Sequence, residues 1–301
     1  MPKKERFIWT DIIITLLALE LMAFFYYGMR ALAVAGLCMG VSFACEYCVL
    51  KLMEQKFTAD NLGCLTDGLL VALMLPVSVG YTIAGTAAVF ANVIGRNIFG
   101  GRSNMIFSPA AIGYLFAVTS WGEKVLMYPK PFTKLGVWDT AHQLVNSATY
   151  TFNHTGEFQV SDYETLMGNF SGPVGAVSIL LLIIGAVVLL FRKDLSLGTL
   201  IGFFAGLAVM CILSPYDVGS FNTFKYVIAT NMTLFTAVFI VSDIRTAPRK
   251  IRYGLFYGLF IAMLSYVLLV LTGIENIFVS ISVLLTPVAL GMRNIERKLE
   301  V

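Results

Sequence analysis

The sequence predicts an all-α polytopic membrane protein with about ten transmembrane helices, arranged as two inverted five-helix repeats with broken helices. Three observations support this fold class. Of the 301 residues, 58% are hydrophobic and only 13% are charged, as is typical of chains that lie in lipid. Apolar stretches recur along the whole chain, and a spanning helix needs about 20 such residues, or fewer when packed inside protein. Finally, basic residues are unevenly distributed among the loops.

Ten apolar segments are the candidate spans. They are 11–27, 31–50, 67–79, 81–94, 104–120, 174–191, 197–213, 224–241, 253–271 and 274–291. The third and fourth are short and meet at Pro76 and Gly80, so they can form one kinked element. No small-residue cleavage site follows the first segment, which therefore reads as a retained helix and not as a signal peptide.

The basic residues predict which side of the membrane each loop faces. With ten spans and a cytoplasmic N-terminus, most of the 21 Lys and Arg residues fall on the cytoplasmic side. The exceptions are Arg30, Lys124, Lys130, Lys134 and Lys225. This asymmetry follows the positive-inside rule, so both termini are expected in the cytoplasm. The net charge of +3 is then an orientation signal and implies no nucleic-acid partner.

The chain divides at one long polar segment. Residues 1–120 form a first five-helix half, 121–172 an external loop and 173–301 a second five-helix half. An odd number of spans per half makes the two halves run through the membrane in opposite senses. This arrangement is typical of inverted repeats that hold a central site.

Three acidic residues in or beside the spans are candidates for an ion pathway. Glu20 and Glu46 lie inside spans, where a charge is costly and is usually paired or functional. Asp67 begins a span, where a helix cap is the simpler interpretation. Both glutamates could instead be protonated, or paired with another subunit, because neither has an evident partner in this sequence.

A glycine-rich run, 95–113, contains two further candidate residues. Asn97 and Asn104 can bond carbonyls that are freed near Pro109, although a helix-packing device explains the glycines equally well. Cys45 and Cys48 have C-x-x-C spacing, but without a second cysteine pair they cannot complete a four-thiolate metal site. We therefore expect no metal in this chain alone.

Four motifs follow one another at characteristic spacing. They are DGLLVALMLP from Asp67, GRNIFGGRSNMIFSPAAIG from Gly95, GPVGAVS from Gly172 and VSDIRTAP from Val241. In order and spacing they resemble the NqrB/RnfD family, which comprises the D subunit of the Rnf electron-transport complex and the B subunit of the sodium-pumping NADH:quinone reductase. The resemblance extends from Asp67 to the end of the chain.

The resemblance implies a subunit that carries a flavin and relays electrons in an ion-translocating complex of the bacterial inner membrane. Its partners would be the other membrane and peripheral Rnf-type subunits. The family motif is similar to G-x-x-G-A/E-T-S, with FMN attached through its phosphate to the threonine. Gly172, Gly175, Ala176 and Ser178 match this motif.

Val177 stands at the threonine position, and a valine has no hydroxyl that could form the phosphoester. We therefore expect FMN or another flavin to be held noncovalently, or through Ser178, or to be lost. A second hypothesis is that the chain is an inverted-repeat secondary transporter or channel without a redox cofactor.

Overall fold

The computed structural model describes residues 8–99, 101, 105–139, 143–156, 158, 160–216 and 218–298, most of them in helices. The first group of helices comprises α1 (Ile8–Tyr27), α2 (Met29–Leu52), the 3₁₀ turn η2 (Ala59–Leu62), α3 (Gly63–Met74), α4 (Tyr81–Phe90), the π-helical segment η3 (Ala91–Asn97) and α5 (Pro109–Val125). A connecting region follows, with β1 (Met127–Pro129), β2 (Leu144–Asn146), α6 (Ala148–Thr155) and α7 (Asp162–Met167).

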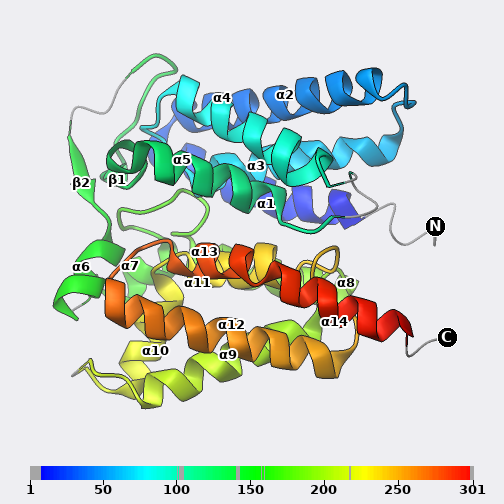
Figure 1. The fold of residues 1–301 in the computed structure, drawn as a ribbon. Coiled ribbons are helices and arrows are strands. Elements are labelled where there is room, and N and C mark those ends of the chain that lie inside the picture. Colours follow the sequence, from blue (N-terminus) through cyan, green and yellow to red (C-terminus); the bar gives the residue numbers. More distant parts are fainter. Residues whose placement is uncertain are drawn as a thin grey trace.

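The second group of helices completes the described chain. It comprises α8 (Ile179–Arg192), α9 (Leu197–Ile212), α10 (Ser220–Ala229), α11 (Thr233–Thr236), the π-helical segment η5 (Ala237–Val241), α12 (Ile251–Thr272), α13 (Ile277–Leu284) and α14 (Thr286–Lys298). The two groups lie one above the other in Figure 1, with the start of α1 and the end of α14 on one side and β1, β2 and α6 on the other. Strands β1 and β2 pair antiparallel, with Tyr128 opposite Val145.

Within the described residues, three helices are long and apolar enough to cross a membrane. They are Trp9–Tyr27, Met29–Leu52 and Ile251–Thr272. Two bent pairs raise this number to five, because α10 with α11–η5 bends by 68° and α13 with α14 by 41°. The fold is thus that of a helical, multi-pass membrane protein. The helix lengths alone establish neither the predicted ten spans nor the inverted repeat.

Several predicted spans are interrupted for reasons that can be read from the residues. Helix α3 ends at Met74 because Pro76 lacks an N–H and disfavours helical geometry at the residue before it. The carbonyls of Val77 and Val79 are thereby freed, and the buried Arg30 guanidinium donates hydrogen bonds to both, at 2.9 and 3.1 Å. Such a substitute donor makes irregular backbone tolerable where water is excluded.

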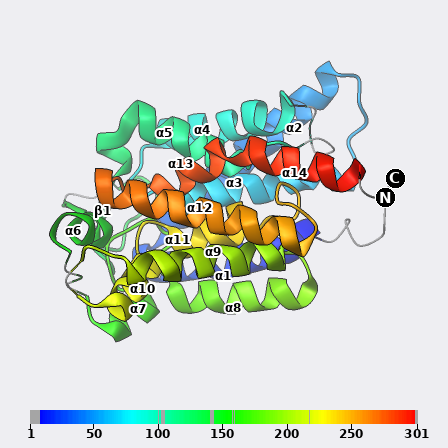
Figure 2. The same ribbon diagram turned by 60° about the horizontal axis from the view of Figure 1, so that its bottom comes forward.

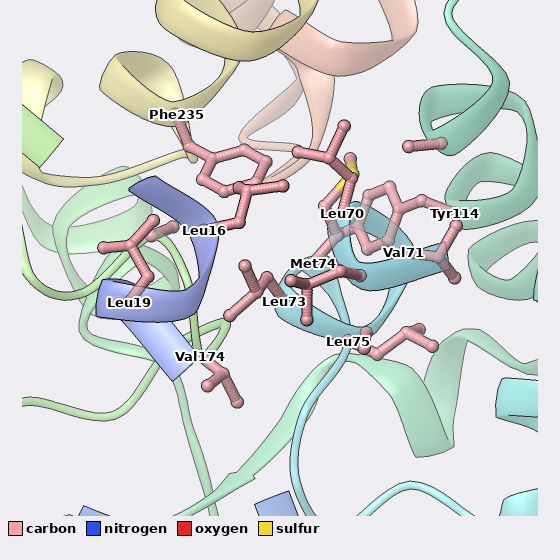
Figure 3. Packing of buried hydrophobic residues seen from close by; sticks show 14 of the residues in the cluster. Leu16, Leu19, Leu70, Val71, Leu73, Met74, Leu75, Tyr114, Val174 and Phe235 are labelled. Carbon is pink, nitrogen blue, oxygen red and sulfur yellow. The ribbon is translucent and has the colours of Figure 1, made fainter. Parts of the chain in front are cut away.

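Helix α3 lies in the core between the two groups of helices. Its side chains from Leu69 to Met74 are buried, and Figure 3 shows Leu73 among Leu16, Val174 and Phe235. The backbone N–H of Gly175 donates to the Leu73 carbonyl at 2.7 Å. The segment before α8 is therefore fixed directly onto α3.

Helices α9 and α12 pack side by side through glycines, as Figure 2 also shows. A Cβ atom at Gly202 would lie 2.1 Å from the Leu255 carbonyl oxygen, and one at Gly258 would lie 2.1 Å from that of Thr199. Only glycine permits this approach, which brings the two backbones into van der Waals contact.

Candidate functional site

Four buried charged side chains and one partly buried arginine form a chain of ion pairs between the two groups of helices, which we call the buried charge cluster. Its members are Glu46, Asp67, Arg96, Asp243 and Arg245. Arg96 donates from Nη1 to Asp67 Oδ2 at 2.6 Å, and its Nε lies 3.3 Å from Glu46 Oε2. Arg245 Nη1 lies 3.6 Å from the other Asp67 oxygen, Oδ1.

Two π-helical segments position the arginines of the cluster. Arg96 lies in η3, and Arg245 follows η5 by a few residues. Single π-helical turns within α-helices occur frequently at functional sites. Gly95 lets η3 approach α5 closely, since a Cβ there would lie 2.7 Å from Pro109 Cα. The glycine-rich run thus serves packing and also directs Arg96 toward α3.

Asp67 is the centre of the cluster and is fully buried. It contacts one arginine from each group of helices, and Arg245 is held in turn by Asp243, with Nη2 to Oδ2 at 2.7 Å. Buried charges persist only when paired, because their desolvation is costly. The cluster contains three carboxylates and two guanidinium groups, so it carries one excess negative charge when every member is ionised.

Glu46 has partners in this chain, and the expectation that it lacks them is wrong. Asn61 and Asn97 donate to its two carboxylate oxygens at 2.9 and 3.1 Å, and Arg96 is its ion-pair partner. These partners of Glu46 could not be identified from the sequence, because Asn61 is 15 residues away and Arg96 is 50 residues away. Helix packing brings them together, as α2 contacts both α3 and η3.

The structure brings three of the predicted site residues together: Glu46, Asp67 and Asn97. Glu20 is buried in α1, its Oε1 has no hydrogen-bond partner among the described residues, and no ion pair joins it to the cluster there. Asn104 lies outside the described residues.

Sequence reasoning missed Arg96, Asp243 and Arg245 as members of the site. Their positions concealed this role, because Arg96 and Arg245 follow the predicted spans 81–94 and 224–241 and count among the cytoplasmic cations. Both arginines also lie within motifs that the family resemblance singles out.

The flavin-motif residues form a compact turn before α8. Val174, Ala176, Val177 and Ser178 are buried, and Val177 is only 2% exposed. A Cβ at Gly172 would lie 2.9 Å from Val177 Cγ1, so the motif packs on itself.

The second motif glycine, Gly175, is also surrounded by protein. A Cβ there would lie 2.7 Å from Leu73 Cβ and 3.0 Å from Phe235 Cε2. The neighbouring cavity, beside Glu20 and Val174, measures only about 10 Å³. A flavin phosphate covalently attached at position 177 does not fit this arrangement. Among the described residues, no group of three or more His, Cys, Asp or Glu side chains is arranged to hold a metal ion.

A much larger cavity, of about 670 Å³, lies beside the buried charge cluster. Arg96 and Arg245 line it, together with Trp9 and Ile12 of α1 and the first residues of α9. It adjoins the C-terminal end of α8, whereas the flavin motif precedes the N-terminal end. Because α8 has 14 residues, about 21 Å of helix separates the two sites.

Comparison with known proteins identifies one family over almost the whole chain. The model of the NQR2, RnfD, RnfE family matches residues 3–292, which is nearly the whole chain. The chain belongs to this family. Its membership fits the helical, multi-pass architecture and the motifs that supply Asp67, Arg96, Asp243 and Arg245.

Several curated relatives within the family are similar to this chain. The D subunit of the ion-translocating oxidoreductase complex of Pseudomonas paraeruginosa is 27% identical over 256 residues, covering 79% of this chain and 73% of the relative. The D subunit of the Na(+)-translocating ferredoxin:NAD(+) oxidoreductase complex of Acetobacterium woodii is 25% identical over 284 residues, covering 94% and 86%. The B subunit of the Na(+)-translocating NADH-quinone reductase of Chromohalobacter salexigens is 26% identical over 222 residues, covering 69% and 52%.

Proposed function

We propose that this chain is the membrane subunit of an Rnf-type, ion-translocating electron-transfer complex, of the ferredoxin:NAD oxidoreductase type. The observation that carries the proposal is the family match over residues 3–292. Relatives named as subunits of ion-translocating oxidoreductase complexes support it, one of them over 94% of this chain. Electron transport and ion transport are accordingly its two activities within the complex.

The buried charge cluster is the site at which we propose that the chain takes part in ion movement. A carboxylate such as Asp67, shared by two arginines, changes its interactions when either arginine moves or when a cation competes for it. Glu46 extends the cluster, and Glu20 offers a separate buried carboxyl group deeper in α1.

For the cofactor, we propose that any flavin in this chain is held noncovalently. The side chain at position 177 lacks a hydroxyl, and Val177 and Ser178 are both nearly inaccessible. When bound, a flavin would supply one- and two-electron transfer. Denatured protein should therefore show no flavin fluorescence on a gel, and FMN found covalently at Ser178 would overturn this point.

We further propose that the chain spans the bacterial inner membrane ten times, as two inverted halves with both termini in the cytoplasm. Two features support this topology. Helix α1 packs against α8, and α5 against α13, as equivalent helices of two related halves would. In Figure 1 the start of α1 and the end of α14 lie at the side opposite β1, β2 and α6.

A secondary transporter without a redox cofactor is the second candidate, and the tightly packed flavin motif favours it. Purification from native membranes separates the two proposals. We expect the tagged chain to co-purify with at least one other polytopic subunit and with the flavin and iron–sulfur absorbance of its partners. A monodisperse single chain that binds a solute and shows no visible absorbance would favour the transporter.

A further inference from the structure

The cavity of about 670 Å³ beside the buried charge cluster has a strongly basic lining. Of its lining residues, six are cationic and none is acidic: Arg96, Lys193, Arg245, Arg249, Arg293 and Arg297. They come from η3, the end of α8, the segment between η5 and α12, and α14. Residues distant in sequence thus converge on one volume.

Half of these cations are not neutralised by the protein around them. Lys193, Arg293 and Arg297 form no ion pair with any residue in the part of the chain that the structure describes. Arg96 and Arg245 are paired through the buried charge cluster, and Arg249 has a partner of its own. The cavity therefore keeps an excess of positive charge, which attracts anions, with Arg293 partly buried and Lys193 and Arg297 exposed at the rim.

Unused hydrogen-bond donors point to the same conclusion. Arg96 is 1% exposed, and its Nη2 is buried without a hydrogen-bond partner among the described residues. Arg293 donates through Nη1 and Nη2 to the carbonyls of Arg245 and Met105, but its buried Nε has no acceptor there. Buried donors left without an acceptor are costly, and a rotation of either guanidinium group toward the cavity would let the oxygens of an anion accept from them.

Two helix N-termini add to the positive potential of the cavity. Helix α9 begins at Leu197 and α12 at Ile251, and both residues line the cavity. Neither helix has a side-chain cap, so first-turn N–H groups remain available. The N-terminal end of a helix favours anions, and phosphate in particular.

From these observations we propose that the cavity is a binding site for a phosphate-bearing anion. The guanidinium groups of Arg96 and Arg293 would bind the phosphate oxygens, and Lys193 and Arg297 would supply charge at the rim. Trp9, Ile12 and Leu190 form an apolar wall beside the basic groups. A phosphate joined to an apolar body, such as an anionic lipid, matches both parts of the lining. The proposal stands apart from the redox activity and does not depend on it.

Titration of the detergent-solubilised full chain tests the proposal, with Trp9 fluorescence as a local reporter. Trp121 and Trp138 are first replaced by Phe, so that Trp9 is the remaining tryptophan. The probes are short-chain phosphatidylglycerol, inorganic phosphate, and short-chain phosphatidylcholine, whose headgroup is zwitterionic. We expect a saturable change with phosphatidylglycerol and none with phosphatidylcholine. A saturable response to inorganic phosphate as well would assign the site to soluble phosphate compounds.

A pair of matched variants shows where the anion binds. The double variant Lys193→Gln/Arg297→Gln removes two exposed cations at the rim, and each loss should weaken binding about five-fold. Arg252→Gln removes one exposed cation of α12 that does not line the cavity, and it should leave the affinity unchanged, whereas each single variant of the pair should not. The proposal is overturned if neither anion saturates, or if both variants weaken binding equally. The titration of the parent protein alone can overturn the proposal, so the test does not depend on whether a variant folds well.

Discussion

Asp67 in α3 and Arg245 after η5 lie 3.6 Å apart, measured from Oδ1 to Nη1, and this ion pair joins the two groups of helices. The other oxygen of Asp67 accepts a hydrogen bond from Arg96 of its own group. The Asp67 carboxylate thus connects the two groups of helices by ion pairs, in addition to the packing of α3 between them. A displacement of either half changes the electrostatic surroundings of the other.

The first prediction concerns the cost of removing the central charge. Asp67→Asn leaves Arg96 and Arg245 without their shared carboxylate in a buried site, which should destabilise the fold by about 3 kcal/mol. We expect a clearly lower melting temperature for the variant in detergent.

Asp162→Asn is the matched control, since Asp162 pairs with Lys225 at 2.6 Å but is 72% exposed. Surface ion pairs contribute little, so its melting temperature should stay at that of the parent. Equal effects of the two substitutions would show that the Asp67 pairs are not buried as described.

A second prediction tests the close packing of α9 and α12. Gly258→Ala places a Cβ within 2.1 Å of the Thr199 carbonyl oxygen, so the helices must separate, at a cost of about 1–3 kcal/mol. Gly36→Ala in α2 meets no atom within 4 Å and should be neutral, or stabilising by up to about 1 kcal/mol. The melting temperature of Gly258→Ala should fall, whereas that of Gly36→Ala should stay unchanged or rise. If both fall together, the α9–α12 contact is looser than the structure indicates.

The third prediction is a pH dependence in the loop between α12 and α13. Burial raises the pKa of Glu275 from 4.5 to about 7, although a hydrogen bond from Ser147 and the nearby His154 partly oppose the shift. Because the pKa is higher in the folded state, Glu275 contributes most to stability below pH 4.5, and this contribution is lost as the pH rises through 7.

Melting curves recorded between about pH 5 and pH 8.5 check this dependence. The parent protein should lose up to about 3 kcal/mol of stability over this range from Glu275 alone. Glu275→Gln cannot ionise and should show a flatter profile, with the two profiles diverging between about pH 5 and pH 7 and running parallel above that range. Parallel profiles for the two proteins over the whole range would mean that Glu275 is not desolvated.

The sequence predicted features that depend on neighbouring residues better than features that depend on contacts between distant residues. Helical, membrane-embedded architecture followed from apolar runs, and the break at Pro76 followed from the chemistry of proline. The breaks inside the eighth and tenth predicted spans, at 230–232 and near Leu285, were not predicted, although Pro287 follows the second break as Pro76 follows the end of α3. The first break also has a local signal, because Asn231 adopts a positive φ of 56°, a conformation that asparagine tolerates better than most residues.

The candidate site was predictable only one residue at a time. Glu46 and Asp67 stood out as acidic groups in or beside apolar segments, but the pairing of Asp67 with Arg245 spans 178 positions, and no periodicity encodes such a distance. The cavity was beyond prediction for the same reason, since its lining comes from both halves. The flavin motif was visible as a pattern, whereas its burial depends on Leu73 and Phe235.

A fourth prediction concerns topology and uses two exposed positions at opposite ends of the molecule. In a Cys48→Ser background, Tyr163→Cys in α7 should react with an impermeant thiol reagent added outside intact cells. Arg252→Cys in α12 should react only after the membrane is opened, as expected for the basic, cytoplasmic side. The reverse labelling pattern would contradict the orientation that we propose.

The most direct test of the account is ion uptake by inverted membrane vesicles from a strain that lacks this chain. We predict that deletion abolishes both electron transfer between ferredoxin and NAD and the Na⁺ or H⁺ uptake coupled to it, and that the wild-type chain restores both. Undiminished electron transfer with undiminished ion uptake in the absence of the chain would contradict its assignment as a membrane subunit of an ion-translocating electron-transfer complex.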